Sequence, residues 1–516
     1  MTGSRWPLDR RRILTGVFLA FALLGGPGAG QEWTSSRHQL RGVTAYVPDT
    51  LLTFAAQVAN DRRGMVDAAT VAEIITQIYR EDGFFLAEAR VAQNGQDILV
   101  DEGYIASIDI EGVDGRHFRA LEQLFAPLIG LRPLRLARFE RTVMLAEDIA
   151  DLDLSTELDF PGGAGARLRV LATQLRRQAG SATLDNPPRE LGESVTLYAV
   201  QEFYSALIVG DLLRLEGSGT AKISDIGTRA LWGALTYRAP IGSSGLYGEA
   251  FVGSVAARRN LSGEYARTDL EGRNASLALG YPVLRDVHSY GYALIEARRS
   301  ETDEETGGVQ FDSAAQVASV TWLYGRRFPG ATALELGTTL SYGEGDTDSA
   351  DANIDDGDSS FWHLRAGLGY TAPLPALSAG AAWRTEIWGQ YSPDRLPSAE
   401  EFILGDRYSL RGYEFDEADG DSGVTAIFEV SHSVFPESAR IDRWGPFAFL
   451  DVGSVSNNDP ASFEIDQVTL ASTGLGLEFD FRGNFFLSGY VGVPLKDGPL
   501  TEAGSPAAYL ALTTSW

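Results

Sequence analysis

The chain of 516 residues carries 43 basic against 70 acidic side chains, and its net charge of −27 excludes the basic surface that nucleic-acid binding requires. It has no cysteine, which excludes disulfide bonds and thiolate metal sites. The 57 glycines, with many Tyr, Phe and Trp residues, indicate an all-β composition rich in turns. We therefore expect a mainly β protein without a nucleic-acid partner.

The N-terminus has the layout of a signal peptide, predicted over residues 1–30. A basic segment, Arg5–Arg12, precedes the apolar run Ile13–Leu24, and small residues at Gly28–Gly30 provide a cleavage site. The apolar run is too short for a spanning helix. The consecutive arginines leave both the general and the twin-arginine export routes open. We expect an exported mature chain.

Two small α+β units are predicted in tandem, over residues 31–103 and 104–177. Each has the order strand, helix, helix, strand, strand, and the helices follow from apolar residues at helical spacing. The first unit is expected to contain strand Gly42–Val47, helices near 48–58 and 71–79, and strands Phe84–Val91 and Ile98–Val100. The second is expected to contain strand Tyr104–Ile110, helices Phe118–Leu128 and Leu136–Ile149, and strands Asp151–Phe160 and Ala166–Ala172.

Residues 178–516 change to an alternation of apolar and polar side chains, which predicts strands with one apolar face. A soluble sandwich gives the same alternation. The sixteen predicted strands lie near 179–186, 193–201, 211–218, 228–239, 245–257, 273–283, 289–300, 314–325, 331–344, 360–372, 377–391, 423–435, 445–456, 467–481, 484–494 and 506–516. Short connections alternate with long, often acidic ones at 258–272, 301–313, 345–359 and 392–422. This regular alternation of short and long connections is typical of an antiparallel transmembrane barrel in an outer membrane.

The chain resembles a known family in its domain order and in its motifs. The tandem units resemble polypeptide-transport-associated (POTRA) domains, and Glu102–Tyr104 resembles the junction after such a domain's last strand. Leu410–Tyr413 resembles the Val/Ile/Leu-Arg-Gly-Tyr/Phe tetrad of two-partner secretion transporters, the haemolysin secretion/activation protein family. Phe402–Gly405 resembles that family's Phe-x-x-Gly segment, and Phe449–Gly453 its Phe-x-Asp-x-Gly motif. The family lies within the superfamily of outer-membrane assembly and transport barrels.

The resemblance implies two POTRA domains in the periplasm, a sixteen-stranded barrel, and a sixth extracellular loop, 402–421, folded into the lumen. We expect Arg411 and Asp451 to form an ion pair that tethers this loop, since bidentate geometry suits arginine and carboxylate. Glu429 is a possible second partner from the lumenal face of its strand. The remaining motif residues are Leu410, Gly412, Tyr413 and Gly405 in the loop, and Phe449 and Gly453 in the barrel.

Two positions depart from the family pattern. Gly405 is followed by Asp406 where the family usually has a second glycine, which leaves the path of the loop backbone open. Only Gln31–Arg41 separates the cleavage site from the first strand, which is short for the plug helix of many family members. The acidic stretches 301–305 and 346–358 lack the spacing of a calcium loop and are expected to be solvated.

The function implied is translocation of an unfolded partner exoprotein from the periplasm to the surface of a Gram-negative cell. The partner implied is a large exported protein, often a β-helical adhesin or cytolysin. Lipids and the barrel-assembly machinery are further expected partners. The sequence has no zinc-binding His pair and no nucleophile elbow, so we expect no enzyme activity, no metal site and no cofactor. An insertase for other barrels, a passive porin and a barrel-bound hydrolase are the alternatives.

Overall fold

The computed structural model describes residues 39–61, 67–160, 165–223, 225–259, 268–306, 309–349, 359–438, 440–460 and 465–516. The predicted signal peptide, residues 1–30, and the first residues of the predicted first unit, 31–38, lie outside this described part. No helix in the described segments is long and apolar enough to cross a membrane.

The first α+β unit is a three-stranded sheet with two helices. The central strand β3 (Ile98–Asp101) pairs in parallel with β1 (Leu40–Arg41) and antiparallel with β2 (Glu88–Val91). Helices α1 (Pro48–Asp61) and α2 (Ala68–Glu81) supply the core. The apolar face predicted around 71–79 is the buried face of α2, as helical periodicity requires.

The predicted strand Gly42–Val47 is wrong, because β1 ends at Arg41. Gly42 has a φ of +85°, which turns the chain out of the strand. The backbone N–H groups of Thr44 and Ala45 then donate to the buried carboxylate of Glu102 at 2.6 and 2.8 Å. The Glu102 carboxylate thus accepts the backbone N–H groups that a neighbouring strand would otherwise accept.

The second α+β unit repeats the predicted element order. Its sheet has the order β4-β6-β5, formed by β4 (Ile105–Glu111), β6 (Ala166–Gln174) and β5 (Leu152–Asp159). Strand β4 is parallel and β5 antiparallel to β6. Between β4 and β5 the chain forms α3 (Gly115–Phe125), the 3₁₀ turn η2 (Ala126–Leu128) and α4 (Leu136–Glu147).

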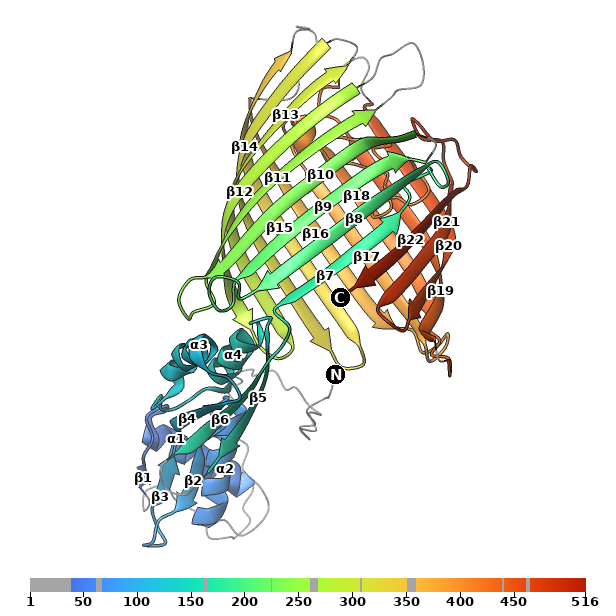
Figure 1. Ribbon diagram of the computed structural model, residues 1–516. Coiled ribbons are helices and arrows are strands. Elements are labelled where there is room, and N and C mark those ends of the chain that lie inside the picture. The colour runs from blue at the N-terminus through green and yellow to red at the C-terminus, as the bar shows by residue number, and fades with distance from the viewer. Residues whose placement is uncertain are drawn as a thin grey trace. The chain divides into compact units, whose positions relative to one another are not determined.

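The rest of the chain forms one closed antiparallel barrel of sixteen strands (Figure 1), which confirms the predicted fold class. The strands are β7 (Gln178–Asp185), β8 (Ser194–Tyr204), β9 (Leu212–Lys222), β10 (Asp225–Pro240), β11 (Tyr247–Arg259), β12 (Thr268–Arg285), β13 (Ser289–Thr306), β14 (Val309–Phe328), β15 (Thr332–Ser349), β16 (Ser360–Pro373), β17 (Ala381–Tyr391), β18 (Ser422–His432), β19 (Ile441–Ser456), β20 (Gln467–Phe481), β21 (Phe485–Pro494) and β22 (Ala507–Ser515). Strand β22 pairs with β7 and closes the barrel. Apolar side chains such as Leu277, Ile295 and Val320 are more than half exposed on the strands, where lipid can cover them.

Of the predicted long loops, 301–313 is largely strand in its described residues, and both described ends of 258–272 are strand. Strand β12 begins at Thr268, and β13 and β14 stay paired as far as Thr306 and Val309, so the stretch 301–305 belongs to β13. Cross-strand ion pairs support this part of the wall, as between Arg258 and Asp269 at 2.8 Å. The alternation of apolar residues fails to detect such segments, because strands that face water on both sides carry no apolar face.

Candidate functional site

The connection from β17 to β18 comprises residues 392–421 and includes the predicted segment 402–421; this whole connection is called the sixth loop below. It contacts the wall at widely separated strands. Arg407 contacts a residue of β7, Glu400 one of β13, and Arg411 one of β19. These strands lie far apart around the closed barrel. One loop can reach all three only by crossing the interior, so the sixth loop lies in the lumen.

The loop has its own backbone structure. Phe402 and Gly420 exchange two backbone hydrogen bonds of 2.7 and 3.1 Å, so the two arms of the loop run side by side. Gly405 ends this pairing with a φ of +93°, a conformation that glycine adopts without strain. The Asp406 carboxylate accepts the N–H groups of Tyr408 and Ser409 and closes the next turn. Asp406, where the family usually has glycine, therefore defines the path toward the tip.

The tip of the loop carries Arg411, which is held by two carboxylates of the wall. Its Nε and Nη2 donate to the two oxygens of Asp451 on β19, both at 2.8 Å. Its backbone N–H also donates to Asp451, at 3.1 Å, and Nη1 donates to Glu429 on β18 at 2.7 Å. Arg411 is 7% exposed and Asp451 0%. The structure thus brings together all three charged residues singled out in the sequence, in the bidentate geometry that makes such pairs strong.

Apolar and aromatic contacts surround this cluster. The guanidinium of Arg411 lies 3.7 Å from the centre of the Phe449 ring, a cation–π arrangement. Leu410 and Tyr413 are buried against Leu470 of β20. The Tyr413 hydroxyl lies 2.9 Å from the backbone carbonyl of Ala471 on β20 and 2.8 Å from that of Lys496 in the connection after β21, so its proton lies between two acceptors. The tetrad is therefore docked by apolar side chains as well as by charge.

Two glycines of the motifs allow this close approach. Gly412 has a φ of +97°, and a Cβ atom there would lie 3.1 Å from the carbonyl carbon of Gly492. A Cβ on Gly453 would lie 2.6 Å from the side chain of Leu404 in the loop. Any larger residue at Gly412 or Gly453 forces the loop or the wall to shift.

A second anchor, which no motif in the sequence indicates, is Glu400 near the root of the loop. Glu400 is 1% exposed, and its carboxylate lies 2.5 Å from Arg298 on β13 and 3.2 Å from His363 on β16. Arg365 on β16 is a third neighbour, at 3.7 Å. At this root an anion of the loop meets cations of the wall, whereas at the tip a cation of the loop meets anions. Glu400 looks like any other acid in an acidic loop, so only the packing reveals its role.

Glu417 is a third anchor of the loop, and it too lacks a recognisable motif in the sequence. Its buried carboxylate accepts the N–H groups of Leu500 and Thr501 at 2.9 and 2.8 Å, and the Thr501 hydroxyl at 2.6 Å. These partners belong to the connection between β21 and β22. The returning arm of the loop is therefore fixed to a second extracellular connection.

A comparison with models of protein families shows to which family the chain belongs. A model of the family described as haemolysin secretion/activation protein ShlB/FhaC/HecB matches residues 165–479, more than half of the chain. The chain belongs to this family. It is an outer-membrane transporter of two-partner secretion and has a large exoprotein as its partner. A comparison with curated proteins gave no match.

Solved structures of similar fold agree with this assignment. CdiB from Escherichia coli matches with a TM-score of 0.76 at 19% identity, over 95% of this chain and 91% of that chain. CdiB from Acinetobacter baumannii matches with a TM-score of 0.71 at 15% identity, over 93% of this chain and 89% of that chain. A BamA structure from Haemophilus ducreyi lacking POTRA domains 1–3 has a TM-score of 0.51 at 15% identity, over 93% and 99%. These likenesses concern the fold, and the family match favours the transporter over the insertase.

Proposed function

We propose that the transporter passes its unfolded partner through the barrel lumen and that the sixth loop is the element that must move. The observation that carries this proposal is the cluster in which Asp451 and Glu429 bind Arg411 at the loop tip. A loop that crosses the lumen occupies space that a translocating chain needs. The cluster then acts as the tether of the resting loop.

A charged tether suits an element that must be released. Breaking an ion pair is costly when one partner stays buried and unpaired, but far less costly when water reaches both partners. Withdrawal of the loop would hydrate Arg411 and leave Asp451 and Glu429 facing a water-filled lumen. The chain has no nucleotide-binding motif, so we take folding of the partner outside the cell as the source of the pull.

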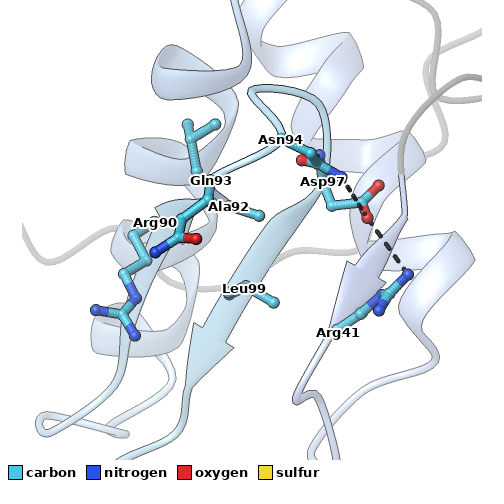
Figure 2. A pocket seen from close by; sticks show the side chains of 8 residues that line it. Arg41, Arg90, Ala92, Gln93, Asn94, Asp97 and Leu99 are labelled. Carbon is cyan, nitrogen blue, oxygen red and sulfur yellow. Dashed lines mark hydrogen bonds and ion pairs between the residues drawn. The ribbon is translucent and has the colours of Figure 1, made fainter. Parts of the chain in front are cut away.

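The two α+β units, 31–103 and 104–177, are proposed to act as POTRA domains in the periplasm and to capture an extended segment of the partner by strand addition. The first unit offers the outer edges of β1 and β2 for this purpose. A depression of about 510 Å³ lies on its sheet. Figure 2 shows the side chains that line it, among them the basic residues Arg41 and Arg90. Backbone pairing with an edge and charge contacts in this depression would hold a peptide without requiring a fixed sequence.

The partner is proposed to be a β-helical adhesin or cytolysin, since the family resemblance implies such cargo. Insertion of the barrel itself is assigned to the barrel-assembly machinery. The closing strand β22, which alternates apolar residues and ends near the aromatic Trp516, is the proposed recognition element.

The tether is tested by secretion of the partner in cells that carry Arg411→Ala, Asp451→Ala, or the exchange of Arg411→Asp with Asp451→Arg. We expect both single variants to reduce secretion and the exchange to restore part of it. Arg482→Ala, which removes an exposed ion pair with Asp442, is the matched control and should secrete normally. Normal secretion and unchanged protease sensitivity of the loop in both single variants would refute the tether. A general loss of other outer-membrane barrels would point to the insertase instead.

A further inference from the structure

The closing seam between β22 and β7 is the shortest pairing in the described barrel wall. It comprises five residue pairs, from Ala511 with Asp185 to Ser515 with Ser181. The pairings on either side, β21 with β22 and β7 with β8, each comprise eight. Beyond its periplasmic end only two further backbone bonds follow, between Gly180 and Trp516, at 3.0 and 3.2 Å. The seam therefore has fewer ladder hydrogen bonds than its neighbours.

At the extracellular end of the seam, hydrogen bonds from side chains replace the backbone hydrogen bonds between the two strands. The Asn186 amide donates to the carbonyl of Ala508 at 3.1 Å, and its oxygen accepts the N–H of Leu510 at 2.9 Å. The Tyr509 hydroxyl of β22 donates to the Asp185 carboxylate of β7 at 2.8 Å. Asp185 is 4% exposed, and its Oδ1 has no hydrogen-bond partner among the described residues. A buried carboxylate in this state needs a cation nearby.

The sixth loop supplies that cation. Arg407 Nη1 donates to Asp185 Oδ2, and it lies 2.6 Å from the Tyr509 hydroxyl. Its guanidinium also lies 5.5 Å from the centre of the Tyr509 ring. One side chain of the loop thus contacts both strands of the seam.

A second arginine ties the loop to the same end of the barrel from the opposite direction. Arg189, just after β7, donates to the carbonyl of Gly412 in the loop tip at 2.9 Å. The same Nη1 donates to the carbonyl of Ser505, just before β22, at 3.1 Å. The loop tip therefore lies between the segments that flank the two seam strands.

We propose that the docked sixth loop latches the closing seam of the barrel, with Arg407 as the positioning residue that joins Asp185 on β7 to Tyr509 on β22. Undocking removes the cation from a buried carboxylate and leaves the shortest pairing of the wall with only the bonds of Asn186 and Tyr509 to support it. Stability of the seam is thereby coupled to the position of the loop. This inference goes beyond the proposed secretion mechanism, because it holds whether or not the loop moves during transport.

The test uses the purified full chain in detergent and the temperature at which the folded barrel unfolds, at one fixed heating rate. Arg407→Met replaces the arginine by a shorter, unbranched side chain that still covers its aliphatic stem, and it removes the charge. We expect it to lower this temperature by roughly 3–5 °C. Adding Asp185→Asn to Arg407→Met should restore part of the loss, because the unpaired buried charge is then gone. Arg482→Met, in an exposed ion pair, is the control and should change nothing.

A designed disulfide between β7 and β22 tests whether the loss of stability in Arg407→Met arises at the seam. The chain has no cysteine, and Thr183 and Thr513 are direct partners whose hydroxyl oxygens lie 2.9 Å apart, close enough for a designed bridge. With Thr183→Cys and Thr513→Cys oxidised, Arg407→Met should cost far less than it does in the reduced protein. An Arg407→Met variant as stable as the parent, or an equal loss with and without the disulfide, would overturn the latch. If Arg407→Met does not assemble, Arg407→Lys, which keeps the charge, should assemble, and its failure would equally overturn the latch.

Discussion

Replacing Asp451 by Asn should release the tip of the sixth loop. Asn keeps the size of the side chain but removes the charge and one acceptor, so the bidentate bonds of 2.8 Å to Arg411 are lost as a pair. Breaking a buried ion pair by changing one partner costs about 3–5 kcal/mol. Glu429 still binds Arg411 at 2.7 Å, so we take the lower figure. About 3 kcal/mol corresponds to a roughly 100-fold larger undocked population.

Glu429→Gln should have a smaller effect. Glu429 makes a single bond to Arg411, and its side chain is 14% exposed. A hydrogen bond to a charged group contributes about 1.5–3 kcal/mol. Because the Asp451 pair stays intact, we take the lower figure, about 1.5 kcal/mol, which corresponds to a roughly tenfold larger undocked population. The predicted order of undocking is therefore Asp451→Asn, then Glu429→Gln, then the parent.

The assay is the labelling of a single thiol placed in the loop. The chain has no cysteine, and the Ser409 hydroxyl is buried without a partner among the described residues, so Ser409→Cys gives a probe that reacts when the loop undocks. The labelling rate follows the undocked population when docking is fast relative to labelling. Asp442→Asn, in an exposed pair with Arg482, is the matched control. Equal rates for Asp451→Asn and the parent, or a faster rate for Glu429→Gln than for Asp451→Asn, would refute this reasoning.

Three further predictions concern other parts of the chain. Gly412→Ala should raise labelling of the Ser409→Cys probe, since its Cβ would approach Gly492 to 3.1 Å at a positive φ. Glu400→Gln should make the loop root more sensitive to trypsin while labelling at the tip changes less than with Asp451→Asn; equal changes at both ends would contradict separate anchors. In the first α+β unit, burial opposes ionisation of Glu102, but hydrogen bonds from Thr44, Ala45 and Tyr79 outweigh it and hold its pKa below the ordinary value. The stability that the ionised Glu102 contributes is then complete above about pH 4.3 and is lost as the pH falls through the lower folded pKa. Amide exchange around residues 44–45 should therefore accelerate in acid. Glu102→Gln should remove this pH dependence.

The sequence by itself determined the architecture, because the signals for it are local and repeated. Alternation with period two marked most of the sixteen strands, and apolar spacing marked the helices before them. The motif around Arg411 and the lone acid at Asp451 stood out because their neighbours are of a different character. The family resemblance then implied that both face the lumen, and the structure brings them together. Errors occurred where no local pattern exists, as in the water-facing ends of β12 and β13 and in the turn at Gly42.

Only the tertiary structure decided which other charges hold the loop. Glu400, Glu417 and Arg407 are ordinary polar residues of an acidic loop in the sequence, yet their partners come from β13, from the connection before β22, and from β7. Asp185 and Arg407 are 222 residues apart, and they meet only because the last strand closes on the first. Such pairs depend on closure, register and the path of the loop across the lumen. The tether at Arg411 can therefore be predicted from the sequence, whereas the latch on the seam can be recognised only in the closed barrel.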